Sequence, residues 1–179
     1  LKEIIKNIIN FFLLNKWLQK KCSTCQWVNE KKKKTTDITI DPSNLNNIKY
    51  VVFKDYFEKL NQCFVDYKTQ YPFLNTFLKS VNIGHFNIQK YLAGDHFSAL
   101  HSERTEIGHL HRLFAWMTYL NDVDDGGSTY FSHYDLKIKP EIGKTLIWPA
   151  EWTHAHCGQV LNTGVKYIIT GWMHFPTNE

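Results

Sequence analysis

The chain has 179 residues, about the length of one domain, and its 43% hydrophobic and 15% aromatic content is that of a folded globular protein. The net charge of +4 comes mostly from lysines near the amino-terminal end; no nucleic-acid-binding motif accompanies them, so no nucleic-acid partner is expected. Four unevenly spaced cysteines do not form a disulfide framework and indicate a reducing, cytoplasmic setting.

The first 18 residues carry hydrophobic side chains at helical spacing. Ile4, Ile5, Ile8, Ile9 and Phe12 share one face of an amphipathic helix, which we expect to pack on a core. A helix lying on a membrane surface is the alternative. Lysine and asparagine residues interrupt the segment throughout, so it does not predict a transmembrane span, which needs about 20 largely apolar residues.

The next segment alternates polar stretches with one helical pattern. Residues 22–28 are expected to form a short strand or a turn, and residues 30–37 a polar loop. Cys22 and Cys25 have the spacing of a zinc or redox pair, but no second ligand pair lies nearby in sequence, so we interpret the spacing as incidental. Residues 50–67 carry hydrophobic side chains three and four apart, which predicts a helix that ends before Pro72.

From Phe86 onward, short β-branched or aromatic runs are separated by Gly, Asp, Asn and Pro, a pattern typical of a β domain. Strands are predicted at residues 86–92, 97–102, 114–120, 128–131, 137–138, 145–149, 153–160 and 165–174. This predicts a single domain of α+β class. Its core, residues 81–179, is expected to be a double-stranded β-helix, a cupin-like jelly roll, supported by N-terminal helices and loops at residues 1–80.

A metal site is predicted within the strands. His101 and Glu103 are two residues apart and would share one face of an extended strand, and His156 offers a third ligand from a second strand. Two imidazoles and one carboxylate that leave further positions open are the ligands of non-haem Fe(II) oxygenases. His154 would share the face of His156 on that strand and is the alternative ligand. The pair His109 and His111 is a weaker candidate for an accidental metal site.

Several short motifs follow one another in this region. They are Tyr91-X-X-Gly94, Phe97, His101-Ser102-Glu103, Arg112-X-X-X-Trp116-X-X-Tyr119-Leu120-Asn121-Asp122, Gly126-Gly127-Ser128-Thr129-X-Phe131, Lys139-Pro140-X-X-Gly143, His156, Gly164 and Lys166. In this order and spacing, residues 86–175 resemble the Fe(II)- and 2-oxoglutarate-dependent dioxygenases, in particular their prolyl 4-hydroxylase-like branch. Glu103 stands where that family more often has Asp.

The resemblance also implies roles for individual residues. In the family pattern a basic residue follows the distal histidine by about ten positions and a glycine by about eight, which favours His156 over His154 as the iron ligand. Lys166 would bind the distal carboxylate of 2-oxoglutarate, and Thr170 on the same face is a weaker candidate. Tyr91 and Tyr119 would line the co-substrate pocket, with aromatic core packing as the alternative. Arg112 would contact substrate at the mouth of the site, with an ion pair as the alternative.

The resemblance implies an enzyme, an oxidoreductase that uses Fe(II), 2-oxoglutarate and O2, with ascorbate as reductant. Its expected substrate is a prolyl residue of a peptide or protein, and its co-products are succinate and CO2. The alternatives are a hydroxylase of a free amino acid or other small molecule, a non-catalytic cupin-like protein that binds a metal or small molecule, and a peptide-binding module. Glu103 argues against a halogenase, which gives up the carboxylate ligand. No residue identifies the substrate or an oligomeric state.

Overall fold

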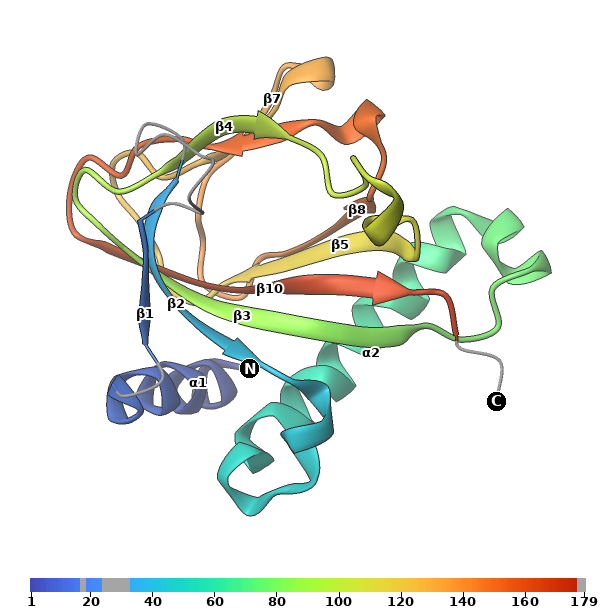
Figure 1. Ribbon diagram of the computed structural model, residues 1–179, viewed down its shortest axis with the longest axis horizontal. Helices are drawn as coiled ribbons and strands as arrows, with labels where there is room; N and C mark the ends of the chain where they lie inside the picture. Colours follow the sequence, from blue (N-terminus) through green and yellow to red (C-terminus); the bar gives the residue numbers. More distant parts are fainter. Residues whose placement is uncertain (17–18, 24–32, 177–179) are drawn as a thin grey trace.

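The computed structural model describes residues 1–16, 19–23 and 33–176. Its strands form two antiparallel sheets that lie one above the other in Figure 1. The larger sheet has the order β1-β2-β3-β10-β5-β8, formed by Lys20–Ser23, Lys34–Ile40, Asn82–Leu92, Val165–His174, Arg112–Tyr119 and Thr145–Pro149. The smaller sheet has the order β4-β9-β6-β7, formed by Phe97–His101, His156–Gly158, Thr129–Phe131 and Leu136–Ile138. The fold therefore mixes helices with antiparallel sheets, as the α+β prediction requires.

Two helices lie on the side of the larger sheet that faces away from the smaller one (Figure 1). Helix α1 spans Lys2–Leu14 and α2 spans Lys54–Gln70. Short segments of 3-10 helix cover Pro42–Asn46, Ile48–Phe53, Pro72–Thr76, Ile107–His109, Ser132–Tyr134 and Trp152–His154. The helices and the sheet share one hydrophobic core.

The buried face of α1 confirms its amphipathic prediction. Ile5, Ile8, Phe11 and Phe12 are buried in the shared core, so the hydrophobic face of the helix packs on the protein. Spacings of three and four residues bring these side chains to one side of a helix. From α2, Phe57 packs edge-on against Phe86 of the sheet, with ring centroids 5.1 Å apart.

A second hydrophobic cluster fills the space between the two sheets. It is formed by residues of both sheets and the loops that join them: Tyr91, Ala115, Met117, Tyr119, Val123, Phe131, Trp148, Leu161 and Ile168. Because side chains alternate along a strand, β5 and β10 contribute to this cluster with one face and to the helix-covered core with the other. The candidate site lies on this inner side.

Most predicted strands lie close to their observed positions, and three other predictions differ from the structure. Residues 30–37 were expected to be a loop, but β2 begins at Lys34 and pairs with β3 through Thr36 to Ile40. The single strand predicted at 153–160 is wrong, because the 3-10 helix at Trp152–His154 precedes the three-residue strand β9. The predicted helix at 50–67 begins later, at Lys54, after a 3-10 turn. Of the stretch 22–28, only the end of β1 is described, and Cys25 lies outside the described residues.

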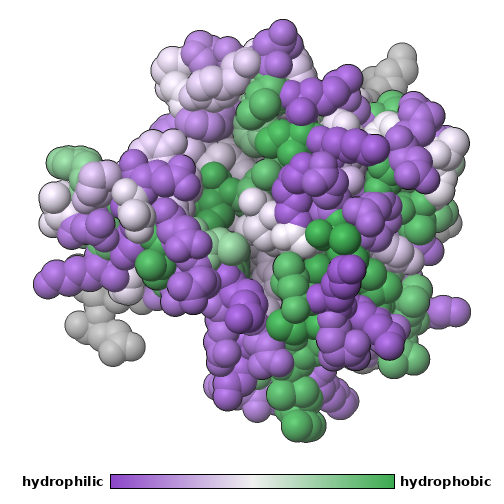
Figure 2. All heavy atoms as spheres, turned by 180° about the vertical axis from the view of Figure 1, so that it is seen from behind, coloured by the Kyte–Doolittle hydropathy of each residue, from purple (hydrophilic) through white to green (hydrophobic). Residues whose placement is uncertain are grey.

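The surface mixes hydrophobic and hydrophilic residues. On the face seen in Figure 2, hydrophobic residues form patches between hydrophilic areas. Two large hydrophobic side chains near the predicted metal ligands are exposed: Ile107, which follows Glu103 along the chain, is 87% exposed, and Trp152, which precedes His156, is 72% exposed. Within the described ranges, no helix is long and apolar enough to cross a membrane.

Candidate functional site

The pairing of β4 with β9 brings two predicted ligands together. His101 ends β4, His156 begins β9, and the two residues are direct partners in the antiparallel pair. Their ring centroids are 4.4 Å apart. Phe97, four residues before His101 on the same strand, stacks on its imidazole at 4.0 Å and fixes the plane of that ring.

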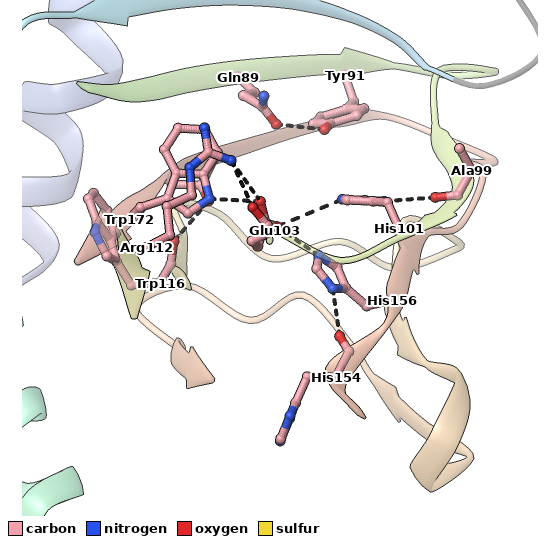
Figure 3. Close-up of polar contacts among 11 residues, drawn as sticks. Gln89, Tyr91, Ala99, His101, Glu103, Arg112, Trp116, His154, His156 and Trp172 are labelled. Carbon is pink, nitrogen blue, oxygen red and sulfur yellow. Dashed lines mark hydrogen bonds and ion pairs between the residues drawn. The ribbon is translucent and has the colours of Figure 1, made fainter. Parts of the chain in front are cut away.

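Glu103 completes the group from the turn that follows β4. Its Oε1 lies 3.4 Å from Nε2 of His156 and 3.9 Å from Nε2 of His101. One ligand atom from each of the three residues lies within 4.8 Å of the others, and no other such group occurs among the described residues. Figure 3 shows the carboxylate and both imidazoles pointing toward one another. The sequence therefore selected three side chains that the fold brings together.

Backbone carbonyl groups fix the protonation of both imidazoles. Nδ1 of His101 lies 2.8 Å from the carbonyl oxygen of Ala99, and Nδ1 of His156 lies 3.0 Å from that of His154. A carbonyl oxygen only accepts, so each Nδ1 carries the proton and donates it. In the neutral form of each imidazole, Nε2 then carries a lone pair directed toward the other two members of the group, as a metal ligand requires.

The side chain of His154 lies away from the group. Because the 3-10 helix ends at His154, this residue does not share a strand face with His156, contrary to the expectation from parity. Its Nδ1 lies 3.0 Å from the hydroxyl of Thr153, and its Nε2 lies 3.3 Å from the hydroxyl of Tyr134. The contribution of His154 is its backbone carbonyl, which sequence reasoning about side chains missed.

Charge in the group favours cation binding. Burial alone would raise the pKa of Glu103, but the hydrogen bond and charge of His156, together with His101 and Trp172, lower it to about 2. Burial and the neighbouring His156 lower the pKa of His101. At neutral pH the group therefore offers an ionised carboxylate and a neutral imidazole. A divalent cation would neutralise the buried negative charge, and the donor set of two nitrogens and one oxygen suits Fe(II).

Lys166 places a buried cation on the inner face of β10. It is 3% exposed, its Nζ donates to the carbonyl oxygen of Gly127 at 2.8 Å, and it lies 4.2 Å from the centre of the Tyr91 ring. Burial lowers the pKa of Lys166 to about 8. None of the ion pairs among the described residues includes this ammonium group. An anion would relieve the cost of its burial.

Both predicted pocket tyrosines border the same inner space. Tyr91 is the direct strand partner of Lys166, and its hydroxyl donates to Oε1 of Gln89 at 2.7 Å. The hydroxyl of Tyr119 lies 2.6 Å from that of Thr129, and burial raises the pKa of Tyr119 to about 12. Both rings belong to the cluster between the sheets, so these tyrosines also have the packing role that was the alternative.

Arg112 lies against the metal group. Its Nη1 donates to the backbone oxygen of Glu103 at 3.1 Å and lies 3.9 Å from Oε2 of the same residue. Its guanidinium stacks on the Trp172 ring at 3.8 Å. Trp172, which sequence reasoning missed, donates its indole N–H to Oε2 of Glu103 at 2.7 Å. Side chains alternate between the two faces of a strand, so Trp172 shares the face of Lys166 and Thr170. This period of two could have identified Trp172 as a residue of the site.

The remaining histidines have other neighbours. Nε2 of His109 lies 3.4 Å from Glu106, whereas the ring of His111 packs edge-on against His174 at 4.4 Å. His109 and His111 therefore point to different partners, which does not favour the accidental metal pair. Of the cysteines in the described part of the chain, Cys63 and Cys157 are free thiols.

A model of the 2OG-Fe(II) oxygenase superfamily matches residues 86–174. This range holds every residue of the metal group as well as Lys166. Among curated proteins, prolyl 4-hydroxylase subunit alpha-1 from Gallus gallus and from Homo sapiens are each 25% identical over 76 residues. The match covers 38% of this chain and only 15% and 14% of those two proteins.

Solved structures share the fold over nearly the whole chain. A Pseudomonas putida prolyl-4-hydroxylase matches with a TM-score of 0.70 and 15% identity, covering 99% of this chain and 89% of that one. The viral collagen prolyl hydroxylase of Paramecium bursaria Chlorella virus-1, in its 2OG complex, matches with a TM-score of 0.68 and 16% identity, covering 99% and 92%. A Trichoplax adhaerens prolyl hydroxylase with a bound hypoxia inducible factor peptide fragment matches with a TM-score of 0.69 and 16% identity, covering 97% and 77%. Residues 86–174 thus match the 2OG-Fe(II) oxygenase superfamily, and the chain is similar to prolyl hydroxylases.

Proposed function

We propose that this protein is an Fe(II)- and 2-oxoglutarate-dependent hydroxylase that acts on prolyl residues of a peptide or protein and releases succinate and CO2. The observation that carries the proposal is the convergence of His101, Glu103 and His156 within 4.8 Å. The buried ammonium group of Lys166 supports it, because a dicarboxylate co-substrate would supply the missing negative charge.

The two facing sheets are proposed to form a double-stranded β-helix, the jelly roll expected from the sequence. The support is their shared hydrophobic cluster and the pairing of sequence-distant strands such as β4 with β9 and β3 with β10. Residues 81–179 would form the core of a single dioxygenase domain, and residues 1–80 would supply the helices and loops that support it.

Each group of the chain has a defined task in this proposal. His101, Glu103 and His156 would hold iron and leave its remaining positions open. When bound, iron would activate O2 so that oxidation of 2-oxoglutarate is coupled to hydroxylation of a C–H bond. Lys166 would hold the distal carboxylate of the co-substrate. Phe131 and Trp148, whose rings lie 5.4 and 5.0 Å from that of His156, keep water from the buried side of this ligand.

A peptide substrate fits the features near the metal group. The ion pair between Arg104 and Glu151, 2.6 Å long, joins the loop after Glu103 to the segment before His154. Exposed Trp152 and Ile107 lie in these two segments and would offer apolar contacts to a bound chain. The Trichoplax adhaerens relative, whose structure holds a peptide fragment, supports a peptide over a free amino acid. The free thiols of Cys63 and Cys157 support the proposed cytoplasmic location.

Turnover assays test the proposal in two steps. Purified protein with Fe(II), ascorbate and 2-oxoglutarate is expected to form succinate, and a His101→Ala variant is expected not to. Proline-rich peptides and free proline are then compared by mass spectrometry for the gain of one oxygen atom. Oxidation of free proline but of no peptide would favour the small-molecule alternative. Absence of succinate with every candidate substrate would favour a non-catalytic binding protein.

A further inference from the structure

The two carboxylate oxygens of Glu103 have different partners. Oε1 faces the imidazoles, at 3.4 Å from His156 and 3.9 Å from His101. Oε2 points the other way and accepts the indole N–H of Trp172 at 2.7 Å (Figure 3). One oxygen of the carboxylate is thus directed at the two imidazoles, and the other is held by a hydrogen bond from the protein.

The fold gives the indole little freedom to leave this position. Trp172 lies on β10 between β3 and β5 and pairs with Ala115 of β5. The guanidinium of Arg112 covers its ring at 3.8 Å, and the same guanidinium donates to the backbone oxygen of Glu103 at 3.1 Å. Arg112 therefore links the ring that donates the hydrogen bond to the backbone of the residue that accepts it.

A glutamate ligand needs such a restraint more than an aspartate does. Glu has one more methylene and one more rotatable bond than Asp, so its carboxylate has more orientations from which to approach or leave a metal. A free second oxygen could also swing round to chelate the ion and occupy a position that the co-substrate or O2 requires. A donor fixed on Oε2 disfavours both movements.

We propose that Trp172 is a positioning residue for Glu103: its indole N–H holds Oε2 so that only Oε1 faces the metal. The inference rests on the proposed function for the identity of the metal but concerns the orientation of the carboxylate alone. It accounts for how this chain uses Glu103, because the indole reaches the outer oxygen of the longer side chain. An aspartate that binds the same ion with one oxygen would hold its other oxygen farther from Trp172.

A double-mutant cycle separates positioning from packing. Trp172→Phe keeps a flat ring beneath Arg112 and removes the N–H donor. It is expected to weaken Fe(II) binding, measured anaerobically by calorimetry, by about 10-fold to 100-fold, the usual loss when a group supporting a metal ligand is removed. In a Glu103→Asp background the same change is expected to cost little, because the shorter side chain has already lost the bond.

Trp116→Phe is the matched control. Trp116 is fully buried in the helix-covered core, and its indole nitrogen has no hydrogen-bond partner among the described residues. This variant also removes a buried indole and should leave Fe(II) affinity at the wild-type value, even if its Tm falls. An equal loss of Fe(II) affinity in Trp116→Phe, or an equal effect of Trp172→Phe in both backgrounds, would overturn the inference.

A second measurement does not depend on the folding of Trp172→Phe. In the nuclear magnetic resonance spectrum, one indole N–H signal of the wild type should exchange slowly with solvent, and it should shift and exchange faster in Glu103→Asp. Unchanged indole signals in that variant would contradict the hydrogen bond. Wild-type protein that binds Fe(II) but forms no succinate would count against the proposed function and leave the positioning result standing, whereas wild-type protein that binds no Fe(II) would overturn the inference.

Discussion

Nδ1 of His156 donates a hydrogen bond to the backbone carbonyl of His154, 3.0 Å away. The two histidines that compete for one role in the sequence thus have different roles in the structure. His156 presents Nε2 to Glu103, while the side chain of His154 contacts Thr153 and Tyr134. The carbonyl of His154 orients its neighbour whatever side chain residue 154 carries.

Replacing each histidine by alanine tests this division. His156→Ala removes a proposed ligand and is expected to abolish detectable Fe(II) binding and succinate formation. His154→Ala keeps the carbonyl that orients His156, so it should retain iron binding. Fe(II) affinity measured by anaerobic calorimetry distinguishes the two variants. Equal loss of iron in both would contradict the choice of His156.

The order and spacing of short motifs were sufficient to select the metal group. His101 ends β4 and Glu103 lies in the turn that follows it, and the glycine and lysine that follow His156 at the family spacing favour it over His154. The prediction that His154 and His156 share one strand face was wrong. It assumed a continuous strand, whereas the chain forms a 3-10 turn at His154. Sequence alone gives no sign of this turn, whose two ends, Ala150 and Ala155, form backbone hydrogen bonds with Leu113 and Ser132, residues far away along the chain.

Strand β2 was missed by the sequence prediction for a different reason. The lysines before it suggested a loop, whereas the alternation of Thr and Ile that follows is typical of a strand. Its buried Asp37 is stabilised by Lys33, Thr35 and Gln89, partners that come partly from β3. A buried carboxylate in a strand becomes favourable only when such distant partners are known, so sequence reasoning treats it as a solvent-exposed residue.

Lys166→Met is expected to weaken binding of 2-oxoglutarate. Losing one side of a buried contact between charged groups costs about 2–5 kcal/mol, so KM for 2-oxoglutarate should rise by roughly 30-fold or more. The apo protein should keep its Tm or gain some, because the variant removes a buried charge that has no carboxylate partner among the described residues.

Lys90→Met is the matched control for that variant. Lys90 lies next to Tyr91 on β3, and its ammonium group lies 5.9 Å from the Tyr167 ring, on the opposite face of the sheet from Lys166. This change should leave KM for 2-oxoglutarate unaltered. A similar increase in both variants would show that lysine loss acts through general charge or folding.

The pH dependence of 2-oxoglutarate binding follows from the same lysine. Burial lowers the pKa of Lys166 to about 8 in the free protein, and a bound carboxylate would raise it again. Affinity should therefore be highest below pH 8 and fall by up to about tenfold per pH unit above it. Calorimetry with Zn(II) in place of Fe(II) measures this without oxidation. Lys166→Arg, which stays protonated, should flatten the curve.

His174 is expected to make the fold less stable in mild acid. Burial, His111, Arg112 and His85 lower the pKa of His174 to about 4, from 6.5 for an ordinary histidine. Between these values the unfolded chain binds more protons than the folded one. The contribution of the neutral His174 side chain to the free energy of unfolding is therefore complete above pH 6.5, and it is lost progressively as the pH falls toward 4. Urea denaturation at pH 7.5 and pH 5 measures the difference in the free energy of unfolding.

His174→Gln should reduce that difference, because glutamine remains neutral at both pH values and has no proton to bind on unfolding. His133→Gln, at an exposed histidine that stacks edge-on with Tyr134, should keep the wild-type difference. Both variants remove one imidazole, His174→Gln from a partly buried position and His133→Gln from an exposed one. The pH dependence of stability that arises from the other carboxylates and histidines therefore cancels when the two variants are compared. Identical pH dependence in His174→Gln and the wild type would show that the packing of His174 against His111 does not affect proton binding.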